Sequence, residues 1–152
     1  VFAFTCMLFG TATADSQQVV TFAKTDDVNS SGWAGVNGKL YPSGHLAVQN
    51  ACRCKAKNGA VRPNAYLLGV SSEGDALWVE HVSAPTCCGT WDPFCHSKQT
   101  RSMVRSIDPE LAKLTIRVDV WNSDRDAPAL YDRLNDAVAK YKDVKQQVLA
   151  TS

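Results

Sequence analysis

The stretch Leu114–Asn122, LTIRVDVWN, gives the clearest indication of fold class in this 152-residue chain. Apolar residues take every second position within it: Leu114, Ile116, Val118 and Val120. Successive side chains of a β-strand point to opposite faces of the sheet, so this alternation predicts a strand with one buried face. A strand of this kind is typical of an antiparallel sheet that packs on a core from one side.

Working outward, further strands are expected from their β-branched and apolar content at residues 19–23, 45–56, 61–71 and 76–82. The dipeptide Asn58-Gly59 between two of these segments is a hairpin signal, so we expect the strands from residue 45 to residue 82 to form a meander. Residues 25–38 are rich in Asp, Asn, Ser and Gly and predict a loop. A second long loop is expected at residues 84–101.

The C-terminal region carries a helical pattern. Its apolar residues recur at spacings of three and four: Leu130, Leu134, Val138, Tyr141, Val144 and Val148. Asp126 is suited to cap this helix and Pro128 to lie in its first turn, while Asp108-Pro109 predicts a short helix start. The expected fold is therefore α+β: one antiparallel sheet of about four to five strands packed against a long C-terminal helix.

The first fourteen residues resemble a targeting segment. They combine an uncharged, mostly apolar run, VFAFTCMLFG, with the small-x-small sequence Ala12-Thr13-Ala14. This is the pattern of a secretory signal peptide, so we expect residues 1–14 to be removed and residues 15–152 to form a single extracellular domain. The alternative is a buried N-terminal strand with Cys6 in a structural disulfide.

Five cysteines follow the predicted signal peptide, at positions 52, 54, 87, 88 and 95. Secretion favours disulfides, and an odd count leaves a free thiol or an intermolecular bond. Cys52 and Cys54 share one face of a predicted strand, so we expect both to bond the loop that carries Cys87, Cys88 and Cys95. Two alternatives stay open: a vicinal Cys87–Cys88 bond, and a thiolate metal site that includes His96. The leading expectation is that the protein binds neither a metal nor a cofactor.

Composition narrows the possible partners. The net charge of +1 supplies no global field for nucleic acid, and no segment reaches the roughly 20 apolar residues of a transmembrane helix. The sequon Asn29-Ser30-Ser31 predicts glycosylation of Asn29 in a secreted glycoprotein.

Catalytic signatures such as G-x-S-x-G, H-E-x-x-H or a phosphate-binding loop are absent from the sequence. Histidine and carboxylate pairs can still perform acid–base chemistry when they share a cleft. The alternative function is therefore a small secreted hydrolase that uses His45 or His81 with Glu80 or Asp119.

The leading interpretation is a non-catalytic extracellular protein with a binding or structural role. Its cysteine-rich loop would present four side chains to a protein or glycan partner: Trp91, Phe94, Lys98 and Arg101. Exposed aromatic rings stack on sugars and anchor protein partners. An unpaired cysteine would allow two copies of the chain to form a disulfide-linked oligomer. The alternative is an oligomer held together by non-covalent contacts.

Overall fold

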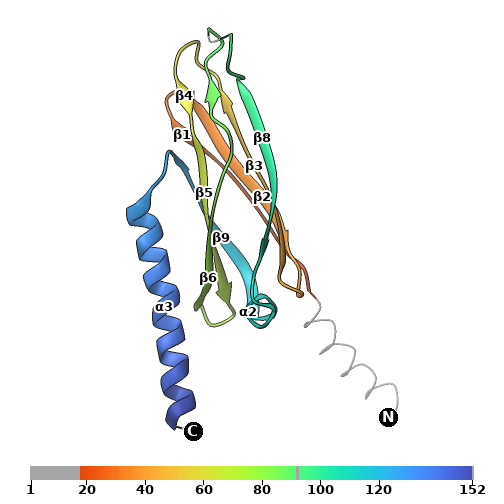
Figure 1. Ribbon diagram of the computed structural model, residues 1–152, viewed down its shortest axis with the longest axis vertical. Helices are drawn as coiled ribbons and strands as arrows, with labels where there is room; N and C mark the ends of the chain where they lie inside the picture. Colours follow the sequence, from red (N-terminus) through yellow and green to blue (C-terminus); the bar gives the residue numbers. More distant parts are fainter. Residues whose placement is uncertain (1–17, 92, 152) are drawn as a thin grey trace, which may run out of the picture.

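The computed structural model describes residues 18–91 and 93–151. Two antiparallel sheets pack face to face, and a long helix lies against the outer side of one of them (Figure 1). The first sheet has the order β1-β2-β3-β8, with β1 Val20–Asn29, β2 Gly32–Leu40, β3 His45–Cys54 and β8 Lys98–Ser106. The architecture is therefore a two-sheet sandwich with a covering helix.

The second sheet has the order β6-β5-β9, with β5 Pro63–Ser71, β6 Ala76–Ser83 and β9 Thr115–Asp124. A short two-stranded ladder joins β4 Ala60–Val61 to β7 Cys87–Cys88. Two helices complete the described chain, α2 Pro109–Leu114 and α3 Pro128–Thr151. The mixed fold with a C-terminal helix agrees with the predicted class, but the strands are more numerous than predicted and form two main sheets.

The main core lies between the two sheets. Leu40 and Leu46, which are register partners in β2 and β3, are almost fully buried, as are Leu67 and Leu77 from the second sheet. Where β1 lies beside β9, side chains bridge the sheets: Lys24 Nζ donates to the Val120 carbonyl at 3.2 Å. Inward-facing apolar residues from both sheets thus share one interior, as in other β-sandwiches.

The segment 25–38 is not a loop, as its composition predicted, but most of the hairpin β1–β2. Its glycines serve close packing: a side chain at Gly38 would collide with the ring of Phe22, and one at Gly32 would collide with the backbone of Arg53. Gly is read as a turn signal because of its backbone freedom, but here its missing side chain is what the sheet requires.

The predicted meander is correct for its second hairpin, β5–β6, but wrong for the pairing of β3 with β5. Asn58-Gly59 does turn, and Gly59 has φ +113°, but the strands on either side belong to different sheets. β5 pairs with β6 and β9, whereas β3 pairs with β2 and β8. The chain crosses between the two layers at this turn because each layer buries its own apolar face.

The strand predicted at Leu114–Asn122 forms as β9, but its predicted burial pattern holds only in the second half. Val118 and Val120 are buried, but Leu114 ends α2 and Ile116 is 55% exposed. Thr115 is buried instead, where its hydroxyl accepts the indole N–H of Trp78 at 3.0 Å. The register with β5 shifts between Val70 and Ser71, which moves the start of the strand to the other face.

Helix α3 forms where the pattern predicted, but its packed length is shorter. Leu134 and Val138 are buried against the second sheet, in a cluster with Tyr66 and Leu68. The helix then continues past the end of the sheets (Figure 1), so Val144 and its later apolar positions are exposed.

Candidate functional site

Disulfides fix one end of the sandwich, which we call the tip: the loop at residues 55–59, the ladder β4–β7, and the loop residues 89–91 and 93–97. Cys52 bonds Cys87 across 35 residues and ties β3 to β7. Cys88 bonds Cys95 seven residues later and closes the second loop on itself. The expected link between β3 and the loop is present, but through Cys52 alone, since Cys54 is a buried free thiol.

Backbone hydrogen bonds hold the two tip loops together. The Gly89 N–H donates to the Gly59 carbonyl at 3.0 Å, and the Trp91 N–H donates to the Lys57 carbonyl at 3.1 Å. A side chain at Gly89 would collide with the backbone of Lys57, so the loops approach as closely as glycine permits. Cross-links of both kinds give the tip a fixed shape.

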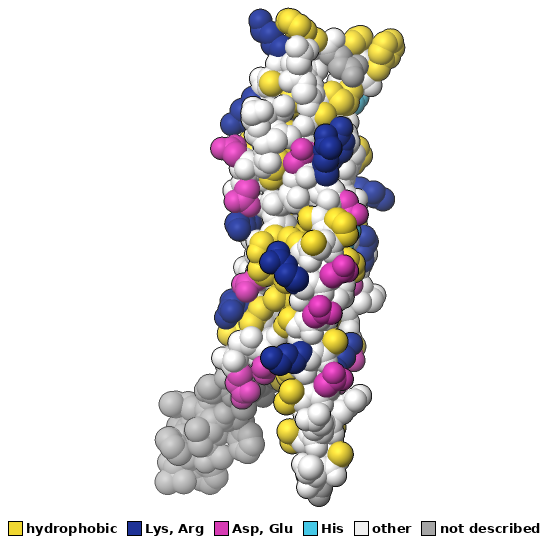
Figure 2. All heavy atoms as spheres, turned by 90° about the vertical axis from the view of Figure 1, so that its left-hand side faces the viewer, with side chains coloured by type: hydrophobic (Ala, Val, Ile, Leu, Met, Phe, Trp, Pro, Cys, Tyr) yellow, Lys and Arg dark blue, Asp and Glu magenta, His cyan; other side chains and the backbone are white. Residues whose placement is uncertain are grey.

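Aromatic side chains project from this end. Trp91 is 66% exposed and Phe94 is 96% exposed. Hydrophobic side chains gather at the upper end of the molecule beside Lys and Arg (Figure 2). The Lys57 ammonium lies 5.8 Å from the centroid of the Trp91 ring. Trp91 and Lys57 also line a cleft of about 470 Å³ between the two loops, together with Asn58, Pro93 and the backbone of both loops.

The two cations predicted for the binding loop lie instead on β8. Lys98 opens this strand next to the tip, directly opposite Arg53 of β3, and both side chains are exposed. Arg101 stands further along the same edge strand, opposite Asn50. Lys98 therefore borders the tip, and Arg101 lies about 10 Å along the strand from it.

The two histidines considered for catalysis lie in different sheets. His45 begins β3 at the end opposite the tip, and its ring lies 5.8 Å from that of Tyr41. His81 stacks on Tyr66 in the second sheet with ring centroids 4.5 Å apart, and its Nε2 bonds the Asn64 amide oxygen at 2.7 Å.

The two carboxylates have separate partners as well. Glu80 lies 3.7 Å from Arg105, and burial raises the pKa of Glu80 while the Arg105 charge opposes that shift. Asp119 forms an ion pair with Arg117 at 3.1 Å. No contact of the described chain brings either carboxylate together with His45 or His81.

Sequence reasoning missed a partly buried hydrogen-bond network at the start of α3. The Tyr66 hydroxyl donates to Asp126 at 2.6 Å and accepts the Ala127 N–H at 2.7 Å. Burial and the bond to Asp126 raise the pKa of Tyr66 to about 12. Tyr66 had only an apolar-strand context in the sequence, and its partners lie 60 residues away. The network anchors the helix to the sheet.

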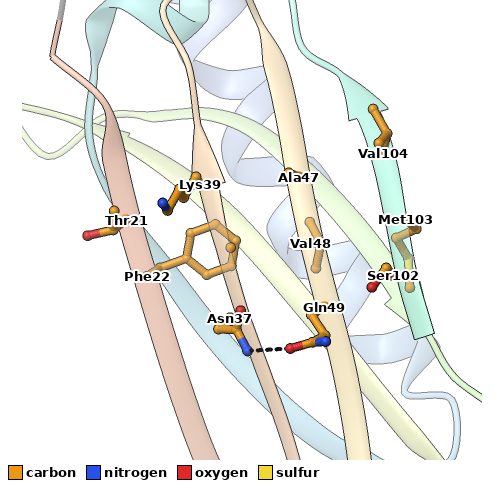
Figure 3. A pocket seen from close by; sticks show the side chains of 11 residues that line it. Thr21, Phe22, Asn37, Lys39, Ala47, Val48, Gln49, Ser102, Met103 and Val104 are labelled. Atoms are coloured by element: carbon orange, nitrogen blue, oxygen red, sulfur yellow. Dashed lines mark hydrogen bonds between the residues drawn. The ribbon is translucent and has the colours of Figure 1, made fainter. Parts of the chain in front are cut away.

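A second hollow, of about 570 Å³, lies on the first sheet (Figure 3). Side chains from β1, β2, β3 and β8 surround it, and the Asn37 amide donates to Gln49 at 3.3 Å across it. Lys39 is the one ionisable residue among those that line it. The hollow therefore lacks the paired groups that acid–base chemistry requires.

The predicted glycosylation site is occupied by internal bonds. Asn29 Nδ2 donates to the Ala60 carbonyl and to Asp124, each at 2.9 Å, and its oxygen accepts the N–H groups of Ser31 and Gly32. A glycan on Nδ2 would replace one of the two donated hydrogens, so the described fold does not favour this modification.

Two further features bear on function. Within residues 18–91 and 93–151, no three His, Cys, Asp or Glu side chains converge as a metal site would require. Over the same residues, no helix is both long and apolar enough to cross a bilayer. The predicted signal peptide and Cys6 lie outside the described residues.

Comparison of the chain with protein-family models, with curated proteins and with solved structures gives no match. The functional argument therefore rests on the geometry of the tip.

Proposed function

We propose that this chain is a secreted, non-catalytic binding protein that contacts an extracellular protein or glycan through its tip. The observation that carries the proposal is the exposure of Trp91 and Phe94 on a loop that two disulfides hold in place. Exposure of a large aromatic ring to water raises the free energy, and burial of the ring against a partner lowers it. A loop already fixed in shape loses little conformational entropy on binding.

Two disulfides and the lack of a membrane-crossing helix in the described chain are compatible with secretion. Disulfides persist in oxidising compartments and are rare in a reducing cytosol. The free Cys54 thiol is buried, so this fold keeps it from the intermolecular bond that an odd cysteine count allows.

The test is an array of immobilised extracellular matrix proteins and glycans, probed with the labelled, secreted protein. The tip variant Trp91→Ser/Phe94→Ser is compared with Val144→Ser/Val148→Ser, which removes two exposed apolar side chains from α3. We expect the wild type and the α3 variant to give the same binding pattern, and the tip variant to lose it, because only the tip variant removes the anchors.

Three results would contradict the proposal: no binding to any array member, binding that survives the tip substitutions, or conversion of a bound ligand into a hydrolysis product. The last result would restore the hydrolase alternative, and single substitutions of His45 and His81 would then identify the base.

A further inference from the structure

We propose, building on the tip function above, that the cleft between the two tip loops binds an acidic polysaccharide, with Trp91 as the stacking platform and Lys57 as the partner of a sulfate or carboxylate group. The cleft of about 470 Å³ has the size of an ordinary small-ligand site. It is formed by chain segments that hydrogen bonds and a disulfide already hold together.

The lining side chains match the chemistry of a sugar ring. The exposed indole of Trp91 gives a flat apolar surface, on which the C–H face of a sugar packs as on other aromatic contacts. Asn58 is exposed and has both amide donors and a carbonyl acceptor, which can pair with neighbouring hydroxyl groups. The Lys57 ammonium lies over the same ring, 5.8 Å from its centroid, where it can pair with an acidic group of a sugar bound beside the indole.

Charge at the tip favours an anionic ligand. Arg53 and Lys98 face each other across two paired strands, an arrangement that destabilises a sheet when no anion lies between them. In the described chain the ion pairs lie elsewhere, at Lys24–Asp26, Arg105–Glu80, Lys113–Glu110 and Arg117–Asp119. None of these ion pairs between described residues includes Arg53, Lys57 or Lys98.

A polymer can reach both groups of cations. Arg53 precedes Lys57 by four residues, so their backbones are at most about 14 Å apart. An acidic oligosaccharide that occupies the cleft can extend over this distance, whereas a single sugar cannot. We therefore expect affinity to rise with oligosaccharide length.

An anionic membrane is the less favoured partner. Trp91 and Phe94 would have to enter the bilayer together, and the sequence places Asp92 between them. A carboxylate is costly to bury in lipid, a cost that a polysaccharide bound in water does not impose. The cleft is also lined by the Asn58 amide and the Lys57 ammonium, polar groups that have no role in insertion into lipid.

The experiment measures binding of the full secreted protein to heparin oligosaccharides of graded length, with hyaluronan as a carboxylate polymer, dextran as a neutral one, and phosphatidylserine vesicles as the membrane probe. Trp91→Ala tests the platform and Lys57→Ala the charge. Lys140→Ala on α3 is the matched control, because it changes net charge equally at an exposed site far from the tip.

We expect binding to an acidic polymer and none to dextran, with Trp91→Ala and Lys57→Ala each weakening binding about tenfold and Lys140→Ala leaving Kd unchanged. Added salt should weaken the wild type more than Lys57→Ala. Equal losses for Lys57→Ala and Lys140→Ala would show non-specific ion exchange and overturn the proposal.

Other outcomes separate this inference from the proposed function. Binding to vesicles without binding to any polysaccharide would refute the acidic-polysaccharide ligand and indicate a membrane as the partner. Tip-dependent binding to a protein of the array, without binding to any acidic polymer, would refute the glycan site and leave the proposed function intact. Loss of every tip-dependent interaction would refute both.

Discussion

The tip and helix α3 are two outlying parts of the same sandwich, and they are held to it by different means. The tip buries a small cluster around Ala34, Val61 and the Cys52–Cys87 disulfide, and two covalent bonds fix it. No disulfide holds helix α3 to the sheet, so its attachment depends on the burial of Leu134 and Val138 and on the hydrogen bonds of Tyr66.

This difference shows how each part relates to function. A disulfide lowers the entropy of the unfolded chain without needing apolar burial, so the tip keeps Trp91 and Phe94 in water. A helix without such a bond must bury part of its own apolar face to stay attached. The tip is thus the part that retains exposed anchors at a fixed position.

The largest expected effect comes from breaking the long-range disulfide. Cys52→Ala/Cys87→Ala releases a loop of 35 residues and should lower the free energy of unfolding by about 3–4 kcal/mol. Cys88→Ala/Cys95→Ala releases seven residues and should cost about 2 kcal/mol. Urea denaturation measures both, and equal losses would mean that loop length does not govern tip stability.

A smaller effect is expected from the packed half of the helix. Leu134→Ala should lower the free energy of unfolding by about 2–3 kcal/mol, because it leaves a cavity against the second sheet. Val144→Ala, one of the exposed positions of the overhanging half, should change it by less than about 0.5 kcal/mol. Thermal and urea denaturation measure both variants. If Leu134→Ala and Val144→Ala gave similar losses, the distal half of α3 would be packed and the contrast with the tip would weaken.

A smaller loss than that of Leu134→Ala should come from the hydrogen-bond anchor. Tyr66→Phe leaves Asp126 and the Ala127 N–H without their partner, at about 1–2 kcal/mol near neutral pH. The folded protein raises the pKa of Tyr66 from 10.0 to about 12, so the fold favours the protonated phenol. Its contribution is complete below pH 10 and is lost as pH rises through 12.

The pH series is therefore the sharper measurement at this position. Urea midpoints of the wild type should fall between pH 10 and pH 12 more steeply than those of Tyr66→Phe. Lysines and other tyrosines titrate in both proteins, so the difference between the two slopes isolates Tyr66. Parallel slopes would show that the hydroxyl is not held as the structure has it.

Local patterns predicted much of the fold. Strands near residues 45–54, 63–71 and 76–83 and the C-terminal helix follow from β-branched content and helical spacing, both of which act over a few residues. The strand predicted at residues 19–23 covers only the start of β1, and β2 and β8 were missed, because these segments are rich in Gly, Asn, Ser and charged residues. Such residues are stable in strands when neighbours supply packing and pairing, and a local pattern does not include those neighbours.

For the candidate site, the sequence indicated Trp91, Phe94 and Lys98 and the loop that carries them, since large aromatics and cysteines are conspicuous in a small domain. It gave no indication of Lys57, Asn58 and Arg53 as their neighbours. These residues are more than thirty positions away, and only the crossing between the two sheets brings their loop beside Trp91.

By itself, the sequence determined the mixed α and β class, the C-terminal helix and the cysteine supply, because hydrophobic periodicity and residue chemistry are properties of short segments. The tertiary structure alone decided the rest: which strand belongs to which sheet, which cysteine stays free, how far the helix packs, and which side chains meet in the tip cleft. These outcomes depend on long-range pairing, whose free energy comes from contacts between segments far apart in the chain.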